Sequence, residues 1–336
     1  MLKTSISVVI PTVGRPELKR AVLSSLAQDF PVHEVLVVAD TLDRVLLPEN
    51  ARVRILHVGP GAGGNVARQH GIEQASGELV ALLDDDDEWM EDRLSSQIAM
   101  LTDAIVSDDS WVASSKLVAK FANGSERVWP EKPIGDADTI AQYIFRKHKV
   151  RGGMGFMQSS TLLFPRTLAL AVPFESSHRF HQDIKWLLDA STQRPNLTVL
   201  QTAHPTVNYH VGVGTVSKKI TAEQSVDWAI TNIGTGDQRT LGDFILTHSL
   251  NAASNSANVS RMVGTVFAGL RLGKPGRSAV VYACSLVIKV AIRNIVDILK
   301  CLACRRAGTR SDETHESVLG IRITHNELAH PKNNSD

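Results

Sequence analysis

Residues 1–215 are predicted to form an α/β domain with a mostly parallel central sheet. Three observations predict this fold. Short β-branched runs alternate with segments whose apolar residues recur at helical spacing. Each run stops at a proline, an aspartate or a glycine-rich loop, as strands do. The most polar residues follow the runs, and ligands of such sheets bind beyond the carboxyl ends of the strands.

The first ninety residues contain most of the regular pattern. Pro16 suits the first turn of a helix, and Ser76-Gly77 suits the end of another. Farther along, a strand before Pro165 and a short helix carrying Trp186 are expected. The predicted strands are 6–10, 34–39, 53–58, 78–83 and 159–164, and the predicted helices are 16–28, 65–75 and 182–190.

The composition is sufficient for a sizeable hydrophobic core but does not indicate a binding partner. The 336 residues are 43% hydrophobic and 21% charged, with a formal net charge of +1. Cys284, Cys301 and Cys304 are too few for a disulfide framework, so a reducing compartment is expected. No secretory pattern precedes the first strand, and charges interrupt the most apolar late stretch. We therefore expect a cytoplasmic protein without a membrane-spanning segment.

Four consecutive aspartates, Asp84 to Asp87, follow the apolar run Leu-Val-Ala-Leu-Leu without a gap. Like charges at this spacing repel and raise one another's pKa values. A divalent cation would relieve the repulsion, and hard oxygen ligands suit magnesium or manganese together with substrate phosphates. A solvated surface turn is the alternative interpretation.

Residues 6–90 resemble the half of family 2 glycosyltransferases that binds the sugar donor. These enzymes have the GT-A fold. Each matching piece is weak alone, but all occur in the order of the family. The pieces are Val8 to Thr12 with Arg15-Pro16, Glu34 to Asp40, Gly63 to Arg68, and Ser76-Gly77-Glu78 leading into Leu83 to Trp89. Ala39 and Val13-Gly14 depart from the usual residues near the base of the nucleotide.

The resemblance implies an inverting transfer of a sugar from a nucleotide-sugar donor, UDP-linked, in polysaccharide or glycoconjugate synthesis of the cell envelope. Asp84-x-Asp86 falls on the D-x-D motif, so Asp84 would lie near the ribose and Asp86 would bind Mn²⁺ or Mg²⁺ at the diphosphate. Asp40 would accept a hydrogen bond from a ring N–H of the nucleotide base. The remaining residues expected at the donor are Pro11, Thr12, Arg15, Gly64, Asn65, Arg68 and Asp85.

A second motif competes with this interpretation. Gly59-x-Gly61-x-x-Gly64 spells a dinucleotide-binding fingerprint between a strand and a helix, which would indicate an NAD(P)-dependent oxidoreductase. However, that fingerprint normally lies in the first β–α unit of its domain, and here another unit precedes it. Four acids would also repel a pyrophosphate unless a cation intervened. A non-catalytic nucleotide-binding protein of the same fold is the third alternative.

Asp183 is the predicted catalytic base. It matches the Asp of an acidic pair that the family carries before an aromatic, although Gln182 replaces the preceding Glu. The resemblance implies that Asp183 takes the proton of an acceptor hydroxyl during a direct displacement. The plain alternative is a helix N-cap.

The C-terminal third has a different character. Residues 216–304 are expected to be helical and basic, with ten Lys/Arg from Arg261 to Arg310 against one acid, Asp297. Lys289, Arg293 and Lys300 share a stripe on an otherwise apolar helix, which fits either a buried helix or an in-plane membrane helix at the inner face of the cytoplasmic membrane. A saccharide or lipid-linked acceptor would suit the second alternative. Nucleic acid is not expected, because stacking aromatics are scarce there. Residues 305–336 are predicted to be a disordered polar tail.

Overall fold

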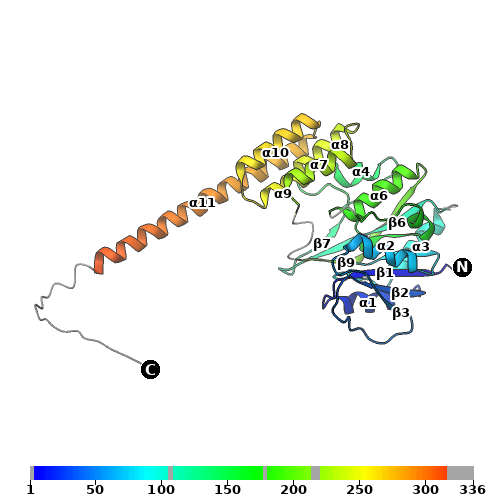
Figure 1. Cartoon of the computed structure of the whole chain (residues 1–336). Helices are drawn as coiled ribbons and strands as arrows, with labels where there is room; N and C mark the ends of the chain where they lie inside the picture. Colours follow the sequence, from blue (N-terminus) through cyan, green and yellow to red (C-terminus); the bar gives the residue numbers. More distant parts are fainter. Residues whose placement is uncertain (1–3, 105–108, 177–179, 213–219, 316–336) are drawn as a thin grey trace, which may run out of the picture. The chain divides into compact units, whose positions relative to one another are not determined.

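The computed structural model describes residues 4–104, 109–176, 180–212 and 220–315. In these residues nine strands form one sheet, in the order β3-β2-β1-β4-β8-β6-β9-β5, with β7 paired to β6 (Figure 1). The strands are β1 (Ile6–Thr12), β2 (Glu34–Ala39), β3 (Val53–His57), β4 (Leu79–Leu82), β5 (Glu88–Trp89), β6 (Trp111–Phe121), β7 (Glu126–Trp129), β8 (Leu163–Pro165) and β9 (Thr198–Val211).

The N-terminal half of the sheet is parallel, as predicted. β1 pairs in parallel with β2 and β4, and β2 with β3. Beyond β4 the ladders are mixed: β8 is antiparallel to both β4 and β6, whereas β6 and β9 are parallel. The α/β class is confirmed, and the parallel pattern covers the four strands that the sequence marks most clearly.

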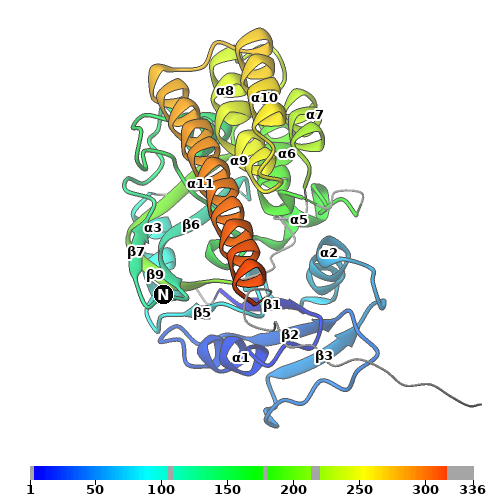
Figure 2. The same ribbon diagram turned by 90° about the vertical axis from the view of Figure 1, so that its left-hand side faces the viewer.

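Alternate residues of β1 belong to two different cores. Val9 packs against Ala67 and Ile72 of α2 (Gly64–Gln74), whereas Val8 and Ile10 pack with α1 (Leu18–Leu26). The two helices therefore cover opposite faces of the sheet (Figure 2). Side chains alternate across a strand, so a strand covered on both faces is apolar throughout. Gly71 permits the close packing of α2, because a Cβ there would lie 2.4 Å from Val9 Cγ1.

One predicted strand is only half present. Over 159–164 the structure has a 3₁₀ turn, Ser159–Thr161, and then β8. The Gln158 side chain accepts a hydrogen bond from the Ser160 backbone N–H, and the Thr161 hydroxyl donates to the Gln158 carbonyl. Polar side chains that bond to the nearby backbone compete with a strand ladder, which explains the difference.

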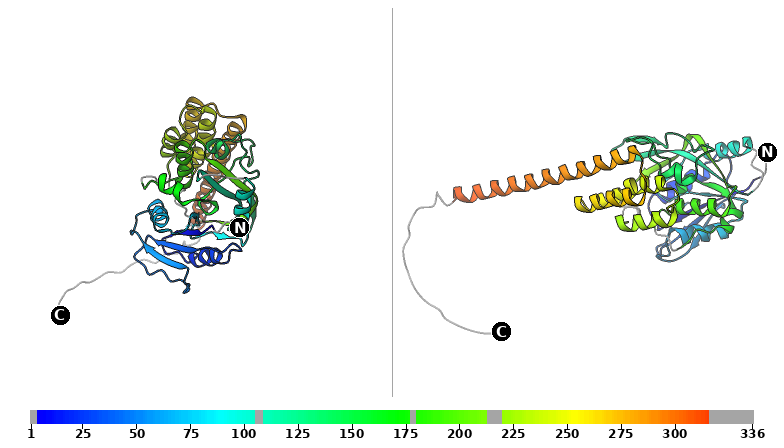
Figure 3. Two further views of the ribbon diagram at one scale, coloured as in Figure 1. Left: turned by 90° about the vertical axis from the view of Figure 1, so that its right-hand side faces the viewer. Right: turned by 90° about the horizontal axis from the view of Figure 1, so that it is seen from above.

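Helices gather beside the second half of the sheet. α4 packs against both α6 and α8, and α8 in turn packs against α7 and α10; this helical half is coloured green to yellow in Figure 3. A five-residue π-helix, Ile245–Ser249, joins α8 to α9. The remaining helices are α3 (Arg93–Asp103), α4 (Ile140–Phe145), α5 (Arg166–Ala171), α6 (Gln182–Gln193), α7 (Ala222–Asn232), α8 (Gln238–Phe244), α9 (Leu250–Ser254), α10 (Val259–Leu272) and α11 (Arg277–His315).

The chain divides into two compact units, residues 1–287 and 288–336. α11 continues to His315, so residues 305–315 are helical where a disordered tail was predicted. Residues 316–336 of that tail, and the predicted boundary at 215, lie outside the described residues. The expectation that no segment could span a membrane also needs correction. Arg277–Lys300 is long and apolar enough to do so by length and composition, with a mean hydropathy of 1.8.

Candidate active site

The polar residues that follow β1, β2 and β4 meet at one edge of the sheet. Parallel strands end together there, which brings Thr12, Asp40 and the Asp84 to Asp87 run close to one another. The Asp40 N–H donates to the Thr12 carbonyl at 2.8 Å, and the Thr12 hydroxyl donates to Asp85 Oδ2 at 2.6 Å. The sheet thus assembles the predicted site residues from three separate segments, and the bonded pair Thr12 and Asp85 is 73 positions apart in sequence.

Burial alternates along the four aspartates. Asp85 and Asp87 are buried, whereas Asp84 and Asp86 are partly exposed. Asp84 to Asp87 form a tight turn, in which the Asp87 N–H donates to the Asp84 carbonyl at 3.2 Å, so neighbouring side chains point toward different surroundings. The two carboxylates of the Asp84-x-Asp86 motif are therefore the ones that reach the surface.

Arg15 stands against the exposed side of this cluster. Its Nη1 lies 2.6 Å from Asp86 Oδ2 and 3.2 Å from Asp85 Oδ1. Burial raises the pKa of Asp85, and the Thr12 hydrogen bond and Arg15 oppose the rise. Burial and the neighbouring Asp84 raise the pKa of Asp86, again against Arg15. Arg15 pairs with Asp85 and Asp86, and Arg68 pairs with Asp84, so two arginines face four carboxyl groups.

Asp84 and Asp183 are linked through Arg68. Arg68 Nη2 lies 2.7 Å from Asp84 Oδ1, and its Nη1 donates to Gln182 Oε1 at 2.9 Å. Asp183 accepts the Ser159 N–H at 3.2 Å and the Ile184 N–H at 2.9 Å. Burial raises the pKa of Asp183, while the Arg68 charge lowers it and Asp84 raises it. Residues about a hundred positions apart in sequence therefore share one electrostatic environment.

The N-cap of α6 is His181, not Asp183. Asp183 lies in the first turn of the helix, two positions after the cap. Asp183 therefore belongs to the N-terminal turn of α6, where its carboxylate accepts the Ile184 N–H.

Asp87 has a different environment from its neighbours. Its side chain is fully buried and accepts hydrogen bonds from Ser160 Oγ at 2.6 Å, Gln158 Nε2 at 2.8 Å and the His210 N–H at 3.2 Å. Burial and the charge of Asp84 raise its pKa to about 8. At neutral pH this carboxyl is mostly protonated, which reduces the charge of the cluster.

The carboxylate of Asp40 holds the glycine loop. Its two oxygens accept the N–H groups of Ala62 and Gly63, each at 2.8 Å. Gly59 lies so close that a Cβ there would be 1.7 Å from Asp40 Oδ1. In a dinucleotide site the loop amides and the helix N-terminus face a pyrophosphate. Here two of these amides bind a carboxylate of the protein, which disfavours the oxidoreductase alternative.

The remaining residues that were predicted to bind the nucleotide-sugar donor lie around the start of α2 and in β1. Asn65 donates from Nδ2 to the Glu175 carbonyl at 2.7 Å, while its Oδ1 is buried with no partner among the described residues. A Cβ on Gly64 would lie 3.0 Å from both Arg68 Nη1 and Gln182 Oε1. Pro11 is a buried residue of β1, paired with Val38 of β2.

Gln158 and Ser160 are site residues that the sequence analysis did not identify. Gln158 Nε2 donates to both Asp84, at 3.0 Å, and Asp87. The Ser160 hydroxyl also accepts the Asp84 N–H at 3.0 Å. The available signal was a run of four polar residues, Gln158 to Thr161, directly before an apolar strand. Such a run inside a core needs polar partners.

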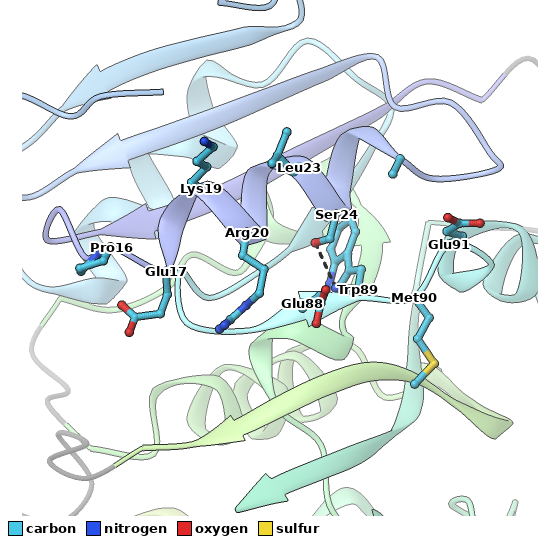
Figure 4. Close-up of a pocket in the computed structure, with 11 residues that line it drawn as sticks. Pro16, Glu17, Lys19, Arg20, Leu23, Ser24, Glu88, Trp89, Met90 and Glu91 are labelled. Atoms are coloured by element: carbon cyan, nitrogen blue, oxygen red, sulfur yellow. Dashed lines mark hydrogen bonds between the residues drawn. The ribbon is translucent and has the colours of Figure 1, made fainter. Parts of the chain in front are cut away.

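A separate open hollow of about 740 Å³ lies beside the carboxylate edge, between α1 and the segment from Glu88 to Glu91 (Figure 4). Glu17 and Arg20 of α1 and Glu88 of β5 border it. Arg20 Nη2 donates to the Asp86 carbonyl at 2.5 Å, so one wall of the hollow is tied to the cluster. The Ser24 hydroxyl accepts the Trp89 N–H at the back of the hollow.

The fold and the site together define a class of protein. The N-terminal half is a parallel α/β sheet with a D-x-D pair at the end of its fourth strand. A second acid, on a later helix, lies across the site from this pair. This combination is typical of a nucleotide-sugar-binding domain of the GT-A type. Residues 7–163 match the model of glycosyl transferase family 2. These residues therefore form a domain similar to that family, whose members are glycosyltransferases.

Named relatives agree with this assignment. The amylovoran biosynthesis glycosyltransferase AmsB of Erwinia amylovora is 29% identical over 222 residues, which are 63% of this chain and 71% of that protein. The UDP-Glc:alpha-D-GlcNAc-diphosphoundecaprenol beta-1,3-glucosyltransferase WfgD of Escherichia coli is 31% identical over 102 residues, 29% of this chain and 40% of that protein.

A solved structure shares the fold. It is S. aureus TarS 1–349 in complex with UDP-GlcNAc, with a TM-score of 0.54 at 18% identity, covering 85% of this chain and 89% of that one. This similarity confirms the GT-A-like fold.

Proposed function

We propose that this chain transfers a hexosyl or related sugar from a UDP-linked donor to a hydroxyl of a saccharide on a lipid-linked acceptor. One observation carries the proposal: the Asp84-x-Asp86 edge and Asp183 face the same site, with Arg68 between them. The names of AmsB and WfgD support a role in polysaccharide synthesis and an acceptor with a diphosphoundecaprenol carrier.

The donor set fits a divalent cation. In the described residues no group of three His, Cys, Asp or Glu side chains could hold a metal by itself. Mg²⁺ and Mn²⁺ bound with nucleotides need only one or two carboxylates, because substrate phosphates supply the rest. Asp84 and Asp86 would hold the ion, and their mutual repulsion favours it. When bound, the ion would neutralise charge on the leaving diphosphate.

The protein residues then have defined tasks. Asp183 accepts the proton of the acceptor hydroxyl while that oxygen forms a bond to the anomeric carbon. The bond from the anomeric carbon to the diphosphate breaks, and its electron pair leaves with the diphosphate. A single displacement inverts the anomeric centre. Arg68 positions both carboxylates, since it contacts Asp84 directly and holds Gln182 beside Asp183.

The metal and donor parts of the proposal are tested together by calorimetry. UDP should bind more tightly with Mn²⁺ than without it, and NAD should not bind. Asp86→Ala should lose the manganese-dependent part of UDP affinity and all turnover while it keeps the fold, because deleting one charge lowers the repulsion in the cluster. Glu91→Ala, on the far side of the hollow, is the control. Unchanged UDP affinity of Asp86→Ala in Mn²⁺ would contradict the metal role, and cation-independent NAD binding would favour the oxidoreductase.

The second half of α11 supports a peripheral membrane contact. Ile288, Ile292, Ile295 and Leu299 recur at spacings of three and four, so they form one face of the helix, and each is 56–59% exposed. Lys289, Arg293 and Lys300 follow a neighbouring stripe. An exposed apolar stripe beside basic residues fits the interface of an anionic bilayer, with the helix lying in the plane.

A second copy of this chain is less suitable as the occupant of that apolar face. The two helices would bring like charges together, because Asp297 is the one acid between Arg261 and Arg310.

A further inference from the structure

The 3₁₀ turn Ser159–Thr161 connects the two halves of the candidate site. The Ser159 N–H donates to the Asp183 carboxylate at 3.2 Å. The Ser160 hydroxyl accepts the Asp84 N–H at 3.0 Å. The predicted base and the carboxylate edge are therefore both attached to this one turn, and a shift of the turn would move one relative to the other.

Three side chains of one other segment bind the backbone of this turn. Trp89 Nε1, Gln97 Nε2 and Arg93 Nη2 donate to the carbonyls of Ser160, Thr161 and Leu162, respectively, each at 2.9 Å. The three donors recur every four residues, and Arg93 and Gln97 lie one turn apart on the same face of α3. The Arg93 guanidinium also lies 3.9 Å from the centre of the Trp89 ring, in a cation–π contact. We call Trp89, Arg93 and Gln97 the turn-binding residues.

The burial of the turn-binding residues is unfavourable for packing alone. Arg93 and Gln97 are fully buried, yet Arg93 Nε and Nη1 and Gln97 Oε1 have no hydrogen-bond partner in the described part of the chain. Burial lowers the pKa of Arg93, and no charged neighbour among the described residues opposes the effect. Unsatisfied buried polar atoms and unpaired buried charges both lower stability. Leucine or methionine would fill this space at lower cost, so the hydrogen bonds to the turn are what these polar side chains contribute.

We propose that Trp89, Arg93 and Gln97 are positioning residues, which fix the turn and thereby hold Asp183 in place relative to the carboxylate edge. A general base depends on such placement, because a displacement of about 1 Å can lower the rate about a hundredfold. The turn-binding residues act on the base through the Ser159 N–H. This inference rests on the proposed function, because it takes Asp183 as the base.

Gln97→Met tests the proposal with little effect on packing. Methionine has nearly the size of glutamine and lacks the amide donor, and it also removes the unsatisfied Oε1. We expect kcat to fall by about tenfold to a hundredfold. UDP affinity in Mn²⁺ should stay at the wild-type value, because the carboxylate edge keeps its ion pairs with Arg15 and Arg68.

The pH profile distinguishes positioning of the base from a general loss of structure. Burial raises the pKa of Asp183, Asp84 adds to the rise, and the Arg68 charge and the Ser159 N–H oppose it. A loosened turn weakens the Ser159 hydrogen bond, so the pKa of the base should rise further in Gln97→Met. The acidic limb of kcat should therefore move to higher pH by about one unit, which is the net effect of about one hydrogen bond.

Hydrogen–deuterium exchange reports on the turn without reference to activity. The N–H groups of Thr161 and Leu162 donate to carbonyls three residues earlier, at 2.8 and 2.9 Å. These amides exchange slowly while the turn is held, because exchange requires local opening. In Gln97→Met, exchange over residues 158–162 should be at least about fivefold faster than in the wild type.

A second variant and two matched controls complete the experiment. Trp89→Phe keeps an aromatic ring and removes the Nε1–H, so it should change exchange and the pH limb in the same direction, even if Gln97→Met does not fold. Gln142→Met on α4 loses an amide hydrogen bond to Asp237, and Trp129→Phe on β7 loses an indole hydrogen bond to a backbone carbonyl. Both controls should match the wild type in kcat, pH limb and exchange of the turn.

Unchanged exchange of the turn, or an unmoved acidic limb, in the Gln97 and Trp89 variants would overturn the inference. Equal effects in the two control variants would overturn it as well. Absence of UDP binding and sugar transfer in the wild type would instead overturn the proposed function. Exchange of the turn would still show in that case whether these side chains hold it.

Discussion

Asp183→Asn is the substitution that bears most directly on the chemistry. Asparagine has nearly the same shape, and its one carbonyl oxygen can still accept the N–H of Ser159 or of Ile184. It cannot accept a proton at neutral pH. We therefore expect kcat to fall by about 10²–10⁴, the range of general-base catalysis, which corresponds to roughly 3–5 kcal/mol of activation free energy.

The stability of this variant should not fall by a similar amount. Burial raises the pKa of Asp183, so the ionised carboxylate is disfavoured in the folded state. An acid whose folded pKa is raised destabilises the protein at pH values above its unfolded pKa. Removing that charge should leave the free energy of unfolding unchanged or increased at pH 7. A large loss of activity with retained stability would separate catalysis from folding.

The assay is steady-state transfer from a UDP-sugar as a function of pH, with UDP affinity measured in parallel. In the wild type, kcat should rise with pH through the elevated pKa of Asp183, and the variant should lack that limb. The control is Asp189→Asn, one helical turn after Lys185 on the same helix, where the carboxylate forms an ion pair with that lysine. Near wild-type turnover of Asp183→Asn, or a comparable loss in Asp189→Asn, would refute the assignment of the base.

Two further predictions concern pH and the membrane. The folded pKa of Asp87, about 8, lies above its unfolded value of 3.8, so the native state holds a proton that the unfolded chain releases. This group should lower the free energy of unfolding by up to about 1.4 kcal/mol per pH unit as pH rises from 4 to 8. Measured by urea unfolding, the free energy of unfolding of Asp87→Asn should depend less steeply on pH than that of the wild type. An identical slope against pH in the two proteins would contradict the burial argument. At the membrane, wild-type protein should co-sediment with vesicles of phosphatidylcholine and phosphatidylglycerol and release in high salt. The double variant Lys289→Glu, Arg293→Glu should bind these vesicles at least tenfold more weakly than the wild type. The control double variant Lys19→Glu, Arg52→Glu should bind them like the wild type. Equal binding of the wild type to vesicles of pure phosphatidylcholine would exclude the electrostatic contact.

The sequence by itself determined the parallel half of the fold and the position of its site. The runs at β1, β2, β3 and β4 are predicted within two residues of their observed bounds. Strands covered on both faces are apolar throughout, and this signal is local. The Asp84 to Asp87 run follows such a strand, so its location at the ligand-binding edge also follows from local sequence.

Only the tertiary structure decided how the site residues divide their tasks. Four identical aspartates have different environments because they form a turn after β4, which buries Asp85 and Asp87 and leaves Asp84 and Asp86 partly exposed. The carboxylate of Asp40 accepts the N–H groups of Ala62 and Gly63 in the loop after β3, a contact that the sequence analysis did not predict. Such contacts depend on distances between segments, and no pattern along one segment encodes them.

The part of the site that is formed by residues after Asp87 was the least predictable from the sequence. β6 and β9 are long strands that mix polar and apolar residues, so their alternation was not recognised, and they form the part of the sheet that supports Gln158 and Ser160. The neighbouring rings of His181, Trp228 and His248 come from three separate segments. Aromatic and polar residues are ordinary in each segment, and they come into contact only when the helices pack together.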